Sequence, residues 1–252
     1  MAELAEVGSL DWGRATGGRL TAGERRALRW AALRDARVYA RSRLLLAIGR
    51  GSRRGSVDLD VLDLPDSALC RAVEAAASER QSPQLLGHAY RTVAYAHVVA
   101  AIDRVELDPE LLWCASLLHD VELEHPVPGR CFAARGGATA EQVALDAGVD
   151  AATARALGDA VCRHATPDLD PAAHPLPYLV AAGALVDVVG KRLDEMDRAF
   201  VQELQRAHPR ADVAKVLRSA WRAEVRAVPD GRAALAERTV LFSLAARLAP
   251  SR

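Results

Sequence analysis

The chain has 252 residues, half of them hydrophobic, which is enough to bury a sizeable core without covalent cross-links. Its 33 lysines and arginines equal its 33 aspartates and glutamates, so the overall charge does not indicate a nucleic-acid partner or an acidic membrane surface. The four cysteines form no CxxC pair, residues 1–6 lack the basic start of a secretory signal, and no apolar run reaches the roughly 20 residues of a membrane span. These features predict a cytoplasmic protein with reduced thiols.

The amino-terminal part of the chain contains one clear helix signal. Residues 1–20 are rich in glycine and have no sustained period, so we interpret them as a loose arm. Thr21 followed by Glu24 forms a capping-box pattern, and apolar residues at helical spacing predict a long helix over residues 21–49. The many arginines of this helix are able to bind phosphates, but a solvated face is the commoner explanation.

The remaining segments also carry helical patterns. A polar loop over residues 49–60 is a candidate linker, so we divide the chain into an amino-terminal arm and arginine-rich helix (1–60) and a helical core with carboxy-terminal helices (61–252). No period-two alternation appears, and the predicted fold is all-α. Caps, turn residues and apolar spacing place helices over residues 64–80, 83–103, 109–120, 137–147, 151–164, 176–190, 193–207, 211–227 and 231–248.

Four residues of the core are candidate ligands of a divalent metal. His119 and Asp120 are adjacent at the end of an apolar helical run, and His88 lies six residues into the preceding helix. Asp187 lies within an apolar helix, where an unpaired carboxylate would cost several kcal/mol. Two imidazoles with one or two carboxylates hold such an ion and leave positions open for water. Zinc fits these ligands best, and iron, manganese or nickel also accept them.

Each candidate also has a structural explanation. Buried histidines usually have a hydrogen-bonded partner, and Asp120 is able to cap a helix. Asp187 has only Lys191 within one helical turn to neutralise it, so a structural role is hardest to assign there. His164 ends a helix before a proline-rich loop, where it would act as acid, base, substrate ligand or further metal ligand. Arg91, one turn after His88, would hold an anionic group or brace Asp120, or lie at the surface.

The order His88, His119–Asp120, Asp187 resembles the HD-domain superfamily of metal-dependent phosphohydrolases and related enzymes, over roughly residues 84–190. The resemblance implies an HD-domain helical bundle in which all four residues bind metal. Members with two ions recruit extra histidines between the HD pair and the last aspartate. The histidines in that interval are His125, His164 and His174. Only His164 ends a helix, so we expect one ion with His164 beside it.

Further details are similar to the cyanamide hydratase-like branch of the superfamily. They are the helix opened by residues 64–67, the histidine-x-x-arginine pattern of residues 87–93, and the phenylalanine-glycine-alanine segment of residues 132–140. Ala133 departs from this branch, which has a glutamate there. Phosphohydrolases of the superfamily often carry a lysine just after the HD pair, whereas this chain carries Glu122 close to it. An acid at that place raises the electrostatic cost of binding a phosphate.

The resemblance implies a metal-dependent hydrolase or hydro-lyase that adds activated water to a small nitrile-like, cyanamide-like or amide-like substrate. His164 or Glu122 would return the proton. Three alternatives stay open: a nucleotide or phosphomonoester phosphohydrolase, a non-catalytic module for ligand sensing or partner binding through the arginine-rich helix, and a dinuclear oxygenase with at least two more histidine ligands. HD folds often associate through outer helices, so a homo-oligomer is expected by analogy.

Overall fold

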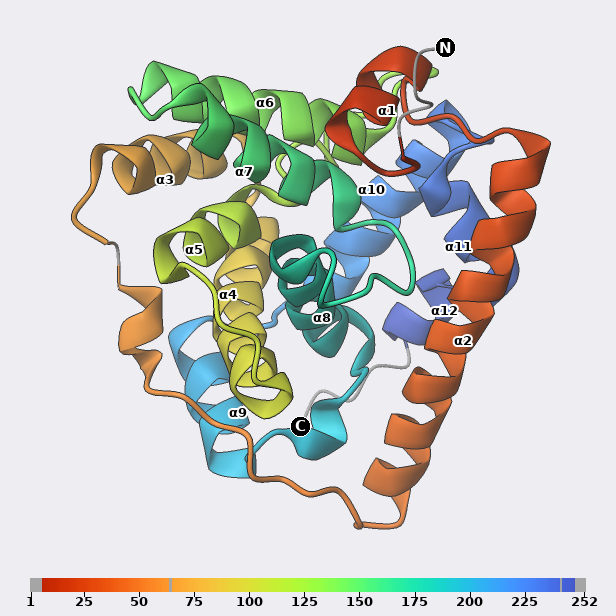
Figure 1. Cartoon of the computed structure of the whole chain (residues 1–252). Helices are drawn as coiled ribbons and strands as arrows, with labels where there is room; N and C mark the ends of the chain where they lie inside the picture. The colour runs from red at the N-terminus through yellow and green to blue at the C-terminus, as the bar shows by residue number, and fades with distance from the viewer. Residues whose placement is uncertain (1–5, 64, 241, 248–252) are drawn as a thin grey trace.

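The computed structural model describes residues 6–63, 65–240 and 242–247. Over these residues the fold is all-α, as predicted, with twelve α-helices, two short 3-10 helices and no strand. None of the helices described combines the length and the apolar character needed to cross a membrane. The elements, labelled in Figure 1 where there is room, are α1 (Leu10–Thr16), α2 (Ala22–Ala47), η1 (Leu59–Leu62), α3 (Ala68–Arg80), α4 (Pro83–Asp103), α5 (Pro109–Leu118), α6 (Phe132–Asp146), α7 (Ala151–Arg163), α8 (Pro175–Val189), η2 (Leu193–Glu195), α9 (Arg198–Ala207), α10 (Val213–Ala227), α11 (Arg232–Val240) and α12 (Phe242–Arg247).

Side-chain caps set several helix starts where the sequence predicts them. The Thr21 hydroxyl accepts from the Glu24 amide, and the Glu24 carboxylate accepts from the Thr21 amide, so the predicted capping box of α2 is confirmed. Asp108 accepts from the Glu110 amide ahead of Pro109, the first residue of α5. Asp150 caps α7 in the same way. These local contacts explain why the helix boundaries follow from the sequence.

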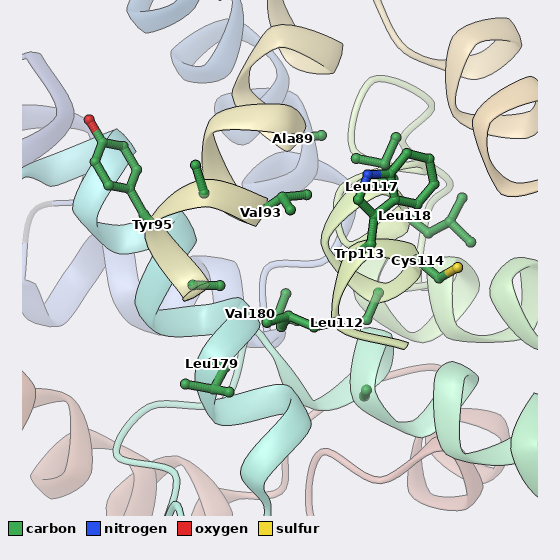
Figure 2. Packing of buried hydrophobic residues seen from close by; sticks show 14 of the residues in the cluster. Ala89, Val93, Tyr95, Leu112, Trp113, Cys114, Leu117, Leu118, Leu179 and Val180 are labelled. Atoms are coloured by element: carbon green, nitrogen blue, oxygen red, sulfur yellow. The ribbon is translucent and has the colours of Figure 1, made fainter. Parts of the chain in front are cut away.

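The core lies where α4, α5 and α8 pack against one another. Figure 2 shows Val93 of α4, Trp113 of α5 and Val180 of α8 facing a shared interior, and all three are almost fully buried. Each fully buried side chain of this size contributes about 1.5–3 kcal/mol. His88 belongs to α4, His119 is the carboxy-terminal cap of α5, and the core therefore fixes both in place.

The amino-terminal arm is folded, which differs from the expected loose segment. Residues 10–16 form α1, and both Leu10 and Trp12 are buried. The Leu10 amide donates to the Asp159 carboxylate of α7 (2.9 Å), and α1 also contacts α6. An apolar pair in a seven-residue helix is too short a signal for a period to be recognised. Residues 1–5 of the expected arm lie outside the described residues.

The long helix α2 packs along α11 at one side of the molecule (Figure 1). It follows α1 in the chain and contacts the carboxy-terminal helix α11. The expected helix over 231–248 is divided into α11 and α12, with residues 241 and 248 outside the described part. The expected helix over 64–80 begins at Ala68, and residue 64 is likewise not described. The segment over 193–207 contains η2 and then α9.

Helix α6 begins at Phe132 and contains Gly136 and Gly137, whereas the expected helix begins only at residue 137. A Cβ atom on Gly137 would lie 2.6 Å from the backbone oxygen of Gly158 in α7. The two helices therefore approach each other more closely than any residue with a side chain allows. A glycine pair has the same sequence signature in a turn and in a close helix crossing, and the tertiary contact decides between them.

Gly137→Ala is expected to lower the free energy of unfolding by about 1–3 kcal/mol, because the added methyl group pushes α6 away from α7. This loss opposes the preference of helices for alanine, which is about 1 kcal/mol. Urea unfolding followed by circular dichroism measures the difference. Gly23→Ala in α2 is the matched control, since no heavy atom lies within 4 Å of its new methyl group. Equal stability of the two variants would contradict the close crossing.

Candidate metal centre

Three predicted ligands come together in the interior of the protein. His88 of α4, His119 at the end of α5 and the next residue, Asp120, form a buried group suited to hold a metal ion. The two Nε2 atoms of the histidines are 3.1 Å apart. One Asp120 oxygen, Oδ2, lies 3.4 Å from His119 Nε2 and 3.8 Å from His88 Nε2. One ligand atom from each residue therefore points at the same small volume.

Hydrogen bonds on the far side of each ring fix the tautomers of these histidines. His119 Nδ1 lies 2.7 Å from the Ser116 carbonyl oxygen, which only accepts, so this nitrogen carries the proton. His88 Nδ1 lies 2.7 Å from a carboxylate oxygen of Asp187 and donates to it. In the neutral rings each Nε2 atom then has a lone pair for a metal ion. Histidine ligands of metals are held in this way, with the other ring nitrogen donating to a carboxylate or carbonyl.

Two imidazole lone pairs and a carboxylate in contact repel one another unless a cation lies among them. Burial lowers the pKa of His119 to about 4, and His88 and His164 act in the same direction against the raising effect of Asp120. Burial alone raises the pKa of Asp120, but His119 and His164 outweigh it and hold this pKa below its ordinary value. Near neutral pH His119 is therefore neutral and Asp120 ionised, which are the states that bind metal.

Asp187 lies behind His88 and not beside the other ligand atoms, which differs from its expected place among the metal ligands. Its Oδ2 accepts from His88 Nδ1, and both carboxylate oxygens accept from the Arg91 guanidinium (2.8 and 2.9 Å). Arg210 Nε lies 3.6 Å away. Burial raises the pKa of Asp187, but Arg91 and Arg210 outweigh this and hold it well below its usual range. The cation that this buried acid requires is thus supplied by arginine.

Arg91 is completely buried and does not reach Asp120, so it braces a different acid from the expected one. Its Nη1 also donates to the backbone oxygens of His208 (3.0 Å) and Pro209 (3.1 Å), in the connection between α9 and α10. A bidentate arginine–carboxylate pair is rigid and directional. Arg91 therefore fixes Asp187, and Asp187 in turn fixes the ring of His88.

His164 is the carboxy-terminal cap of α7 and lies at the edge of the group. Its Nδ1 donates to the Val161 carbonyl (2.6 Å), and its Nε2 lies 3.6 Å from Asp120 Oδ1. The ring contacts His119 and Phe132 edge-on. His164 is thus placed as expected, beside the group and facing the same cavity.

Glu122 is directed away from this cavity, which differs from its expected catalytic place. Its carboxylate is bound by Arg80 (2.6 Å), Arg135 and the Thr139 hydroxyl (3.0 Å). Arg135 also donates to the Glu122 carbonyl. Both carboxylate oxygens accept hydrogen bonds from protein side chains, so the acid is held by its surroundings. We therefore assign Glu122 to the support of the loop after the HD pair.

The other two histidines of the predicted interval lie apart from the group. His125 is exposed, with its Nε2 2.8 Å from the Arg80 carbonyl, and His174 pairs with Glu6 (3.1 Å). Neither contributes to a second cluster. Among the described residues, one group of three has the geometry of a metal site.

A cavity of about 530 Å³ opens onto the group and contains His88, His119, Asp120 and His164 in its wall. Most of the remaining wall comes from α2, α8, the segment 165–169 after α7 and the carboxy-terminal helices α10–α12, and Phe132 of α6 also contributes. Sequence reasoning did not anticipate that α2 contributes Tyr39 or that α10 contributes Trp221. The apolar positions of these helices were visible in the sequence, but nothing in it showed which helices would face each other.

Comparison with protein-family models matches none of them, and comparison with curated proteins finds no similar sequence.

Proposed function

We propose that this protein is a metal-dependent hydrolase or hydro-lyase whose ion is held by His88, His119 and Asp120. The observation that carries the proposal is the convergence of two Nε2 lone pairs and one carboxylate, each fixed from behind, in a buried site. Zinc is the favoured ion because two imidazoles and a carboxylate are a common set of ligands for catalytic zinc. A divalent ion held in this way lowers the pKa of bound water and supplies a nucleophile near neutral pH.

The neighbouring side chains have roles that follow from their placement. His164 faces the cavity beside Asp120, so its ring is placed to accept a proton from the attacking water and return it to the product. Asp187 and Arg91 act through His88, since their contacts hold its ring in one tautomer and one orientation. The reaction class is addition of water to a small electrophile, a nitrile-like carbon or a carbonyl, in line with the resemblance to the cyanamide hydratase-like branch of the HD-domain superfamily.

The test is a comparison of three substrate panels on the wild-type protein: nitriles, small amides and phosphomonoesters. Hydration or hydrolysis of a nitrile or an amide, lost in His119→Ala, is the expected result. Turnover of phosphomonoesters alone would replace the proposal with a phosphohydrolase. A protein that holds its ion and turns over none of the panels would be a binding module.

His164→Gln is expected to reduce turnover by roughly 10²–10⁴-fold, because the variant loses the proton acceptor at the edge of the site. The content of bound metal is expected to stay at the wild-type level, since His164 is outside the group of three. Steady-state kinetics and metal analysis on the same preparation separate the two effects. His174→Gln, at a histidine paired with Glu6 away from the site, is the control. Unchanged turnover in His164→Gln would remove its catalytic role.

A further inference from the structure

The wall of the cavity is mainly apolar, and its aromatic residues extend to the candidate metal group. Phe242 of α12 stacks on Trp221 of α10 with ring centroids 4.2 Å apart. Trp221 meets Phe132 edge-on at 6.3 Å, and Phe132 meets His164 edge-on at 5.7 Å. We call Phe132, Trp221 and Phe242 the aromatic wall. A molecule whose polar head reaches His164 and Asp120 therefore has aromatic surface directly beside the rest of its body.

Two further helices also contribute apolar residues to the wall. Helix α8 contributes Leu185, Val188 and Val189, and α2 contributes Ala36 and Tyr39. The volume of about 530 Å³ is typical of sites for ligands of drug size. A nitrile or amide group by itself occupies a small part of this space. The cavity thus has room for a body several times larger than the reacting group.

Most charged residues of the lining outside the candidate metal group already have a partner of opposite charge. Asp35 pairs with Lys191, Arg192 with Asp103 and Glu195, and Asp168 with Arg34. Arg232 contacts neutral groups, the Cys162 carbonyl and the Thr166 hydroxyl. Arg232 is also almost completely buried, above the ring of Trp12. An anionic ligand body would have to compete with these acids for a cation or lie against apolar surface, where an uncompensated charge is costly.

We infer that the substrate of this site is an uncharged molecule with an extended apolar body, which lies along the aromatic wall and presents its polar head to His164 and the candidate metal group. The inference rests on the proposed function for the chemistry of the head. The apolar character of the body is inferred from the lining of the cavity and does not depend on that function. Apolar contact drives binding in proportion to the area removed from water, so longer bodies bind more tightly until the cavity is full.

Isothermal titration with straight-chain primary amides from acetamide to octanamide tests this inference on the protein as purified. Each added methylene group is expected to lower the dissociation constant about fourfold over the middle of the series. Octyl phosphate, which has the same body and a charged head, is expected to bind more weakly than octanamide to protein treated with a chelator. Equal affinity along the series, or tighter binding of octyl phosphate to that protein, would overturn the inference.

Two pairs of variants locate the binding site. Trp221→Ala is expected to weaken octanamide binding on the order of tenfold and to leave acetamide binding unchanged, because it removes part of the aromatic wall. Trp30→Ala is the control, since Trp30 is 64% exposed and lies outside the cavity. Ala36→Phe, which fills the cavity from α2, should also weaken octanamide binding, whereas the exposed Ala40→Phe on the same helix should not. If each cavity variant and its control change octanamide binding equally, the ligand does not lie in this cavity.

The design separates the inference from the proposed function. A rise in affinity with chain length that persists after chelation, in a protein without turnover, supports the apolar body and counts against the hydrolase. Turnover of short amides with no dependence on chain length supports the hydrolase and overturns the apolar body.

Discussion

Arg91→Met is expected to lower the free energy of unfolding by about 3–5 kcal/mol, which is a large share of the stability of most domains. The substitution keeps a long side chain in the core but removes both hydrogen bonds to Asp187. That carboxylate is completely buried, so it is left with His88 and the more distant Arg210. The backbone oxygens of His208 and Pro209 lose their donor as well. Urea unfolding of wild type and variant measures the loss.

Arg71→Met is the matched control for this experiment. Arg71 pairs with Asp66 at the surface, where both side chains are solvated, and its removal is expected to leave stability almost unchanged. A similar small effect of both substitutions would show that Arg91 does not neutralise a buried acid.

The pH dependence of stability provides a second readout of the same pair. Asp187 has a lowered pKa in the folded protein, so its contribution is fully present above the unfolded value of about 3.9 and is lost as the pH falls through the folded value. In Arg91→Met the folded pKa of Asp187 rises, and the contribution is lost at a higher pH than in wild type. Unfolding free energies measured between about pH 3 and pH 7 should therefore diverge most above pH 4. Parallel curves for the two proteins would contradict this account.

The sequence predicts those features that depend on neighbours along the chain. The caps of α2, α5 and α7 are set by side chains within three residues, and all three were correctly expected. His119 and Asp120 are brought to one place by the end of a single helix. His88 was proposed as a further ligand from the preceding helix, and the structure places it beside them.

Features that depend on contacts between helices were not predictable in the same way. Asp187 was expected to need a metal because Lys191 is the only basic residue within one helical turn of it. In the folded protein Arg91 reaches it from α4. Glu122 follows the HD pair closely, but Arg80 and Arg135 come from distant segments and withdraw it from the cavity. The aromatic wall combines residues from three segments that have no shared pattern in the sequence. In each case the deciding partner is more than ten residues away.

Loss of metal in His119→Ala is the second large effect expected. The substitution removes one of three ligands and leaves His88 Nε2 and the Asp120 carboxylate, which is too few for tight binding of a divalent ion. The affinity should fall by far more than the 10–100-fold that follows loss of a supporting hydrogen bond. His125→Ala is the control, because His125 is exposed and contacts the Arg80 carbonyl away from the site.

The most direct test is the metal content of wild type, His119→Ala and His125→Ala, all purified without chelators or metal-affinity resin. The account predicts about one zinc-like divalent ion per chain in wild type and in His125→Ala, and little or none in His119→Ala. Equal metal content in all three proteins would place the ion elsewhere. No ion in any of them after incubation with zinc, iron, manganese and nickel would contradict the proposed metal centre.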